Sequence, residues 1–318
     1  ASERVPMLVG KAPGRRFAPS KINMTYTLRR LETYDDYKAC ERLQEQAWDF
    51  SDPRDVIPLT NLVTVQKWGG LVLGAFEEGG GLSGFCYGFL GRDPEGRLVH
   101  CSHMLAVDER ARNTGLGARL KWAQRDYILR EGLDMIVWTF DPLESVNAHL
   151  NFGKLGGLSN NYVINLYGET TSKLHAGTAT DRLTIKWLIG SPRVERRASG
   201  EVSEVAVALG ADRIDAPWAL QADGWGPGEP VLDLDAPRIR CEIPVNVQEV
   251  KSHDRGAAVA WRDATQALFT GYFERGYYTR ECAHRPGDGA DERPKSVYLF
   301  EHGDLETAGA DRTGAILE

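Results

Sequence analysis

The apolar positions of residues 24–190 switch between the two-residue period of strands and the roughly 3.6-residue period of helices. Strands are expected at four stretches: 24–30, 71–78, 81–92 and 97–107. The pattern predicts a helix over about 34–50, with Thr33 as its cap. A second helical stretch covers 53–68 and is broken near Pro58. This half therefore begins as helices beside a meander of strands.

The pattern after residue 107 alternates helices with strands. One helical face is formed by residues spaced four, three and four apart: Leu116, Leu120, Ala123 and Tyr127. The continuous apolar run at 134–142 is typical of a strand buried on both faces. Residues 144–157 favour a helix that is stopped by glycines. Two further strands are expected at 160–168 and 181–190, with Asp181 and Arg182 as a surface ion pair.

The remaining residues change character. Residues 191–240 are rich in Pro, Gly and Asp, with weak strand signals such as the one at 204–210. A strand at 240–247, a long helix at 254–276 and two strands at 277–282 and 295–301 follow. The aromatic residues of this part are expected in the core: Trp261, Tyr272, Tyr277 and Tyr278. Residues 303–318 are expected to fray.

Composition narrows the class of protein. The 318 residues are 42% hydrophobic and 26% charged, and no apolar run is long enough to span a membrane. Residues 1–21 lack the apolar run of a secretory signal, so we expect a flexible tail there. A net charge of −7 argues against nucleic-acid or membrane-surface partners. Five scattered cysteines without a Cys-x-x-Cys pair indicate free thiols and a cytoplasmic protein.

A glycine loop at 112–117, Arg-Asn-Thr-Gly-Leu-Gly, leads directly into the helix pattern. It lacks the Lys-Ser/Thr ending of a Walker loop. A dinucleotide fingerprint would start its glycines directly after a strand in a parallel unit, whereas five residues follow Val107 here. Glycines ahead of a helix still let several N–H groups converge on one phosphate. The alternative is a tight turn with no ligand.

The stretch "LAVDERARNTGLGARL" resembles the acyl-CoA-binding motif of the GNAT superfamily of N-acetyltransferases. A second block supports the resemblance, because "MIVWTF" followed by "NAHLNFGKLGG" is similar to the strand and helix that come next in that family. Asn147 matches an Asn that contacts the cofactor, and Leu155 and Gly156 match the end of the helix. The two blocks cover residues 102–157, and the order of the flanking elements fits from about 24 to 190.

The resemblance implies an α/β fold with a mixed, splayed central sheet and flanking helices. It implies that acyl-CoA enters where two central strands part. Its pantetheine would pair with the backbone of Leu105, Ala106 and Val107. Its pyrophosphate would lie on the N–H groups of the loop, which are those of Arg112, Asn113, Thr114, Gly115, Leu116 and Gly117. The co-substrate implied is acetyl-CoA or another acyl-CoA, with no metal.

The best candidate for a catalytic base is His103. The arylalkylamine N-acetyltransferases, a GNAT branch, have His-x-His-Ala-Leu-Ala-Val where this chain has Cys101-Ser-His103-Met-Leu-Ala-Val, so the second histidine is retained. An imidazole can take a proton from an ammonium near neutral pH. The alternative is a strand histidine that is satisfied by its neighbours. His100, Cys101 and His103 lack the spacing of a metal site, and Cys101 is expected to be a buried thiol.

The general acid of many family members, a Tyr, falls on Phe152, which cannot donate a proton. Tyr162 and Tyr167 are alternative donors, although tyrosines in strands usually pack. The sequence thus predicts an acyl-CoA-dependent N-acyltransferase acting on an amine of a small molecule or peptide. Two alternatives stay open: a CoA-thioester-binding protein with little transferase activity, and a structural or interaction module. Members of the superfamily often form dimers, so a homodimer is an expectation.

These inferences divide the chain into three parts. Residues 1–21 form the tail, 22–190 the acyl-CoA-binding domain and 191–318 a carboxyl-terminal α/β extension. The stretches "EIPVNV", "AWRDA" and "GYFERGYY" of the extension resemble the tail of an uncharacterised bacterial GNAT branch. The extension is either a second, degenerate copy of the domain or a cap that shapes the acceptor site.

Overall fold

A computed structural model describes residues 25–48, 52–168, 179–285, 287 and 293–309. The predicted tail at 1–21 lies outside these residues. The elements of the first half are β1 (Tyr26–Arg30), α1 (Tyr34–Trp48), a 3-10 turn (Pro53–Asp55), α2 (Leu59–Lys67), β2 (Leu71–Glu77), β3 (Leu82–Arg92), β4 (Leu98–Val107), a second 3-10 turn (Glu109–Ala111), α3 (Leu116–Arg130), β5 (Met135–Phe140), α4 (Ser145–Ala148), a π-helix (His149–Lys154), β6 (Tyr162–Val163) and β7 (Arg182–Leu188). Helices and strands follow the predicted order closely in this half.

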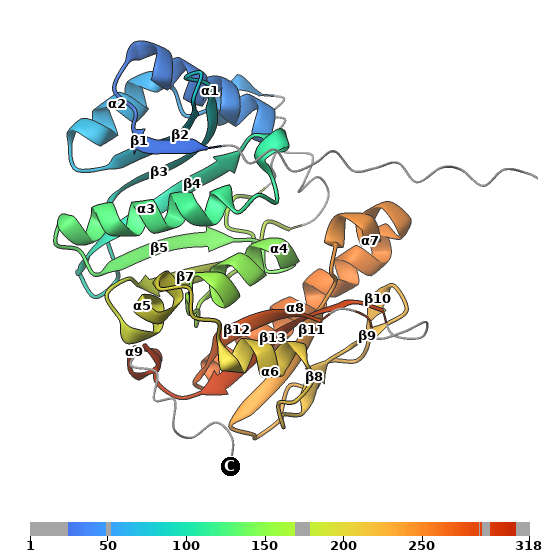
Figure 1. Cartoon of the computed structure of the whole chain (residues 1–318). Helices are drawn as coiled ribbons and strands as arrows, with labels where there is room; N and C mark the ends of the chain where they lie inside the picture. The colour runs from blue at the N-terminus through green and yellow to red at the C-terminus, as the bar shows by residue number, and fades with distance from the viewer. Residues whose placement is uncertain (1–24, 49–51, 169–178, 286, 288–292, 310–318) are drawn as a thin grey trace, which may run out of the picture.

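Seven strands form one sheet in the order β1-β2-β3-β4-β5-β7-β6. All neighbouring strands run antiparallel except β4 and β5, which run parallel. The carboxyl ends of β4 and β5 therefore lie at the same edge of the sheet, beside the start of α3 and beside α4 (Figure 1). The mixed central sheet implied by the sequence resemblance is confirmed.

Helices cover both faces of this sheet because its strands alternate. In β2, Leu71, Leu73 and Ala75 join the core under α3. Val72 and Phe76 point the other way, into the core under α1 and α2. The cap predicted for α1 is confirmed, since Thr33 Oγ1 accepts the backbone N–H of Asp36 at 3.2 Å.

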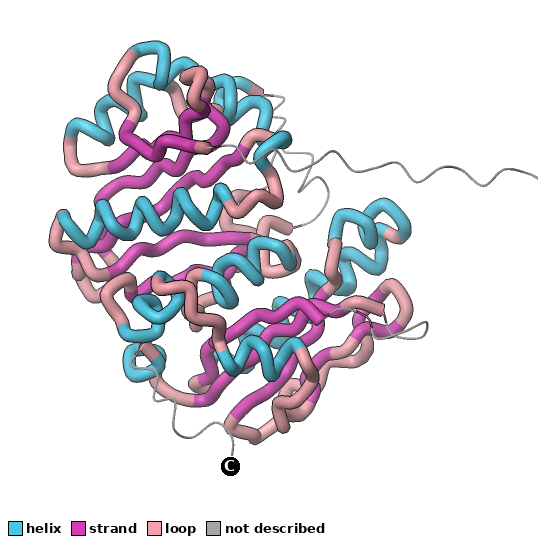
Figure 2. The backbone as a smooth tube through the Cα atoms, viewed as in Figure 1, coloured by secondary structure: helices cyan, strands magenta, loops and turns pink. Residues whose placement is uncertain are grey.

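The second half adds α5 (Pro192–Ala198), α6 (Glu204–Gly210), β8 (Trp218–Leu220), β9 (Ala222–Asp223), β10 (Gly226–Pro227), β11 (Arg238–Ile243), α7 (Val247–His253), α8 (Arg255–Glu274), β12 (Tyr277–Arg285), β13 (Lys295–His302) and α9 (Leu305–Ala308). Four of its strands form a sheet in the order β12-β13-β11-β8. Helix α6 packs on one face and α8 on the other. Figure 2 shows the two sheets with helices along their faces.

Several predictions of local structure were wrong. Residues 204–210 form helix α6 rather than a strand, because the Ser203 side chain caps them and Val205 and Leu209 face the sheet one helical turn apart. Only Tyr162 and Val163 of the stretch 160–168 pair as a strand. Within 303–318, residues 305–308 form helix α9, and 310–318 lie outside the described residues.

The predicted surface pair of Asp181 and Arg182 is in fact buried, at 0% and 8% exposure. Asp181 accepts a hydrogen bond from the Tyr162 hydroxyl at 2.7 Å and one from the backbone N–H of Asn165. Arg182 donates to the backbone carbonyl of Asp181 at 2.9 Å. The extension and this edge of the first sheet cover both side chains, which the sequence pattern does not reveal.

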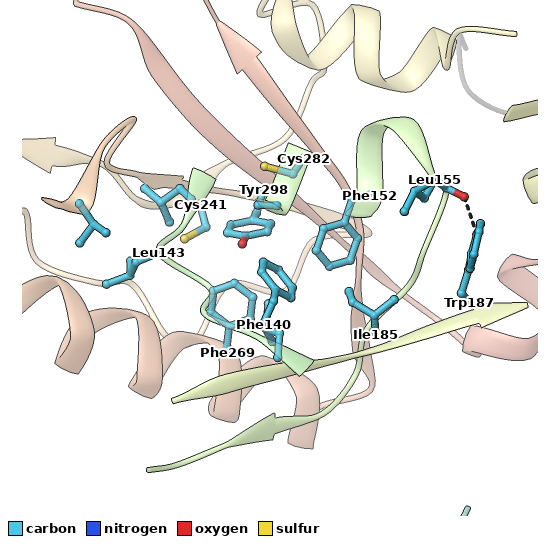
Figure 3. Packing of buried hydrophobic residues seen from close by; sticks show 14 of the residues in the cluster. Phe140, Leu143, Phe152, Leu155, Ile185, Trp187, Cys241, Phe269, Cys282 and Tyr298 are labelled. Atoms are coloured by element: carbon cyan, nitrogen blue, oxygen red, sulfur yellow. Dashed lines mark hydrogen bonds between the residues drawn. The ribbon is translucent and has the colours of Figure 1, made fainter. Parts of the chain in front are cut away.

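One hydrophobic core runs from the first sheet into the extension. Phe152, next to α4, stacks edge to face on Tyr298 of β13, with ring centroids 5.7 Å apart. Trp187 of β7 donates its indole N–H to the Leu155 carbonyl at 2.7 Å, closing the same cluster (Figure 3). The aromatic residues expected in the core of the extension are buried: Trp261, Tyr272, Tyr277 and Tyr278. The extension therefore packs directly behind the second half of the first sheet.

Candidate functional site

Strands β4 and β5 pair at only two positions and then part. The pairs are His100 with Ile136 and Cys101 with Val137. Beyond them, β4 keeps its bonds to β3 as far as Val107, and β5 keeps its bonds to β7 as far as Phe140. The facing backbone edges of the two strands are thus open to a ligand.

This separation corrects the prediction that 134–142 is buried on both faces. Val137, Trp138 and Thr139 are only partly buried. They lie where β4 has separated from β5, so β4 no longer shields these β5 residues from solvent. For this reason an apolar strand in the middle of the sheet is only partly buried.

A β-bulge in β4 lies just beyond the separation point. Tyr87 pairs with Met104 and Gly88 with Ser102, so His103 is an extra residue without a partner opposite. Bulges bend a strand and redirect its side chains. The bulge thus reinforces the departure of β4 from β5.

The loop from 108 to 115 curls the backbone toward one point. The Asp108 side chain accepts the N–H of Arg110, and Thr114 Oγ1 donates to the Ala111 carbonyl at 2.7 Å. Asn113 and Gly115 have positive φ angles of 62° and 85°. Successive turns of opposite hand form a concave nest of N–H groups, and a helix N-terminus adds further free donors and partial positive charge.

The two glycines of the loop have different roles. Gly115 caps α3 in the left-handed region, where other residues are strained. Gly117 is inside the helix, and a Cβ there would meet Leu105 and Val107 only at 3.8 and 3.9 Å. The fold requires the first glycine but tolerates a side chain at the second.

The residues proposed to hold the cofactor lie along one path. Leu105, Ala106 and Val107 are on β4 past its separation from β5. The loop residues 112–117 continue from that strand into α3. Asn147 is exposed on α4, next to the end of β5. These positions share the edge of the sheet at which β4 and β5 end (Figure 1).

His103 is exposed on β4, on the face of α1 and α2. Its ring lies 6.0 Å from that of Tyr87 and 6.1 Å from that of Phe89, measured between centroids. Partial burial against these rings lowers the pKa of His103. A neutral imidazole at pH 7 is suited to accept a proton.

The aromatic residue at the family's acid position and the two alternative tyrosines differ in how far solvent reaches them. Phe152 is fully buried. The Tyr162 hydroxyl is committed to Asp181, and burial raises its pKa. Tyr167 is 52% exposed, and its hydroxyl lies 3.3 Å from Thr139 Oγ1 of β5. Of the three, only Tyr167 presents a hydroxyl to solvent beside the open strand.

Replacing Phe152 with Tyr should not supply an acid. The ring is enclosed by Phe140 and Tyr298, so the new hydroxyl would be buried without a partner and should lower the free energy of unfolding by about 1–3 kcal/mol. Urea denaturation checks the stability, and initial rates check the chemistry. Phe273→Tyr is the matched control because Phe273 is only half-buried. A faster Phe152→Tyr enzyme would contradict the expectation.

The sequence interpretation missed a buried polar cluster under α3. Lys121 and Gln124 of α3 meet His100 and Ser102 of β4. The signal was present, because the buried stripe of α3 includes both Lys121 and Gln124 among Leu116, Leu120 and Ile128. Polar residues on the apolar face of a helix are the exception that needs a partner or a function.

His100 belongs to this cluster and not to a metal site. Its Nε2 accepts from Gln124 Nε2 at 3.1 Å, and burial lowers its pKa to about 3. His103 lies on the opposite face of the sheet. Among the described residues, no group of three His, Cys, Asp or Glu side chains could hold a metal ion. Over the same residues, no helix is both long and apolar enough to cross a membrane.

No family model and no curated protein matches the sequence. The chain is similar to a chain of the NatC complex bound to Gag peptide and CoA, at 17% identity and a TM-score of 0.43, over 52% of this chain and 99% of that one. It is similar to the ribosomal-protein-S18-alanine N-acetyltransferase from Escherichia coli at 18% identity and a TM-score of 0.42, over 52% and 94% of the two chains. A GNAT-family acetyltransferase from Streptococcus pneumoniae gives 19% identity and a TM-score of 0.40, over 52% and 100%.

The fold of this half follows from its own geometry. Its sheet is antiparallel except for one parallel central pair, and that pair separates after two residues on each strand. A glycine-capped helix starts at the edge where the pair opens. These are the features that the sequence resemblance implied, so the predicted mixed, splayed central sheet with flanking helices is confirmed for the described residues of this half.

Proposed function

We propose that this protein is an acyl-CoA-dependent N-acyltransferase that uses acetyl-CoA. The observation that carries the proposal is the parting of β4 from β5 directly beside the 112–117 loop. An open strand edge can pair with the amides of pantetheine, and the loop can bind a pyrophosphate. The two features share one edge of the sheet and follow one another in the chain.

Transfer proceeds by direct attack of an amine on the thioester carbon. The open edge of β4 supplies backbone N–H groups to the carbonyl oxygen, where negative charge develops. His103, neutral near pH 7, takes the proton that the amine loses. The acceptor is an amine of a small molecule or a peptide, and it reaches the carbonyl from the side of His103.

A second candidate function is a CoA-thioester-binding protein without transferase activity. It is favoured by the burial of Phe152 at the family's Tyr position and by the commitment of Tyr162 to Asp181. Neither of these two residues offers a free hydroxyl to the leaving thiolate, so Tyr167 is the tyrosine candidate that remains of those considered. The two functions share the binding site and differ only in turnover.

The test combines binding and turnover. Calorimetric titration with acetyl-CoA should show one site per chain with a micromolar Kd, a range typical of co-substrates. Incubation with a panel of amines and peptides, followed by mass spectrometry, should show acylated product. Binding without any product supports the second function. If acetyl-CoA and longer thioesters all fail to bind, both functions are excluded.

A further inference from the structure

Lys121 lies where β4 and β5 begin to part. Its Nζ donates to Ser102 Oγ of β4 at 2.9 Å and lies 3.6 Å from the ring centroid of Trp138 of β5. Ser102 and Trp138 are the first residues beyond the last paired positions of their strands. The amine thus occupies the closed end of the opening between the two strands.

Among the described residues, none supplies a counter-ion to Lys121 there. Its side chain is buried, and Nζ also donates to Gln124 Oε1 at 2.9 Å. The titratable groups of the described residues that face it are Cys86 of β3 and Cys101 of β4, with His100 of β4 reached through Gln124. Burial raises the pKa of both thiols and keeps His100 neutral, so none of the three balances an ammonium charge.

The protonation of Lys121 is therefore poised near neutrality. Burial lowers its pKa to about 7, while the π face of Trp138 favours the charged form. A buried cation without a partner carries a large desolvation cost. That cost falls if an anion is formed beside the amine during function.

We propose that Lys121 is the catalytic residue that donates a proton to the thiolate of CoA, an inference that rests on the proposed function. From Val107 to Ser102 the strand covers five residues, roughly 16 Å at about 3.3 Å per residue. An extended pantetheine arm is of similar length. A CoA molecule anchored at the 112–117 loop and aligned along β4 would place its sulfur beside Lys121.

The step balances in atoms and charge. The amine nitrogen forms a bond to the thioester carbon, the C–S bond breaks, and its electron pair goes to sulfur. The Lys121 ammonium first holds the thiolate as an ion pair and gives it one proton as CoA leaves, so that CoA departs as a thiol and Lys121 remains as a neutral amine. His103 takes the proton of the acceptor amine. After CoA leaves, solvent restores the proton of Lys121.

The positions of the two residues suit these roles. His103 contacts rings of the core under α1 and α2, whereas Lys121 projects from α3 on the other face. Base and acid are thus separated by strand β4, so neither neutralises the other. Lys121 also fills the role for which Phe152 is chemically unfit.

The test measures the thiol pKa of bound CoA, which requires no knowledge of the amine. The ultraviolet absorbance of the thiolate is followed against pH for CoA bound to the wild-type protein and to Lys121→Met. In the wild type the bound thiol should titrate at least about one unit below the thiol of free CoA measured in the same buffer, giving roughly tenfold more thiolate at a given pH. In Lys121→Met it should titrate at or above the free value. The thiols of the protein contribute little signal, because burial raises their pKa, and a spectrum of the protein without CoA at each pH is subtracted.

Controls separate this proposal from the function on which it rests. Lys67→Met removes an exposed lysine from α2 and should match the wild type. Lys121→Gln keeps a donor toward Ser102 and serves for the same comparison if Lys121→Met does not fold or bind CoA. Equal thiol pKa values in wild type and variant, with CoA bound to both, would overturn the role of Lys121 alone. Failure of the wild type to bind CoA overturns the proposed function and this inference with it.

Discussion

Replacing Asp141 with Asn should lower the free energy of unfolding by about 3–5 kcal/mol, the range measured when one partner of a buried ion pair is removed. Asp141 follows β5 and accepts two hydrogen bonds from Arg262 of α8, at 2.8 and 2.7 Å. Both side chains are 6% exposed. An amide keeps the shape of the carboxylate but leaves the guanidinium charge uncompensated inside the protein.

The same ion pair should also make the free energy of unfolding depend on pH. Burial raises the pKa of Asp141, but the hydrogen bonds and charge of Arg262 outweigh it and lower the pKa overall. A lowered folded-state pKa stabilises the protein above the unfolded value of about 3.9, and this stabilisation is lost as the pH falls through the folded value. The difference between wild type and Asp141→Asn should therefore be constant from about pH 5 to 7 and shrink below about pH 4.

Urea denaturation at several pH values measures both effects. Asp263→Asn, which removes an exposed carboxylate from the middle of α8, should leave the midpoint unchanged. The double variant with Arg262→Met should recover part of the loss, because it removes the unpaired charge. A single-variant loss below about 1 kcal/mol would contradict the expectation that this buried ion pair stabilises the fold.

Replacing Gly117 with Asp should weaken acetyl-CoA binding by roughly 100-fold, equivalent to about 2.7 kcal/mol, without lowering stability. The position lies in the first turn of α3, where the N–H groups are proposed to bind the pyrophosphate. A carboxylate there would repel the phosphates and occupy their space. The same carboxylate interacts favourably with the helix N-terminus, by about 0.3–1 kcal/mol.

Gly117→Asp is informative because the carboxylate should weaken acetyl-CoA binding while it stabilises the helix. A Cβ at 117 meets only ordinary contacts, so the fold accommodates it. Gly117→Asn has the same size without the charge and separates repulsion from steric exclusion. Gly115 is a poorer choice, because its φ of 85° makes any other residue strained. Calorimetry and thermal unfolding measure the two quantities, and unchanged affinity in Gly117→Asp would rule out the loop as the pyrophosphate site.

Periodicity and turn chemistry identified much of the first half. Alternation in β2 and β3, the stripe in α3 and the glycines after Arg112 depend on neighbours in the chain, so they are visible without a structure. Residues 204–210 were assigned wrongly because a stretch of only seven residues fits either period, and only the cap at Ser203 and the sheet beneath favour the helix.

The chemistry of the site was only partly accessible. His103 and the 112–117 loop were found because a contiguous motif contains them. Lys121 was missed because its significance depends on Ser102 and Trp138, which reach it from two different strands. The burial of Asp181 and Arg182 depends likewise on tertiary cover rather than on their own sequence context.

The sequence by itself determined the order of most elements, the resemblance to an acyl-CoA-binding motif and the absence of a tyrosine at position 152, since each is a property of local spacing or residue type. Tertiary structure alone decided where β4 leaves β5, which face His103 occupies and that Lys121 is buried without a counter-ion. The reason is physical: hydrogen-bond pairing between strands and desolvation of a side chain arise from segments that are distant in the chain.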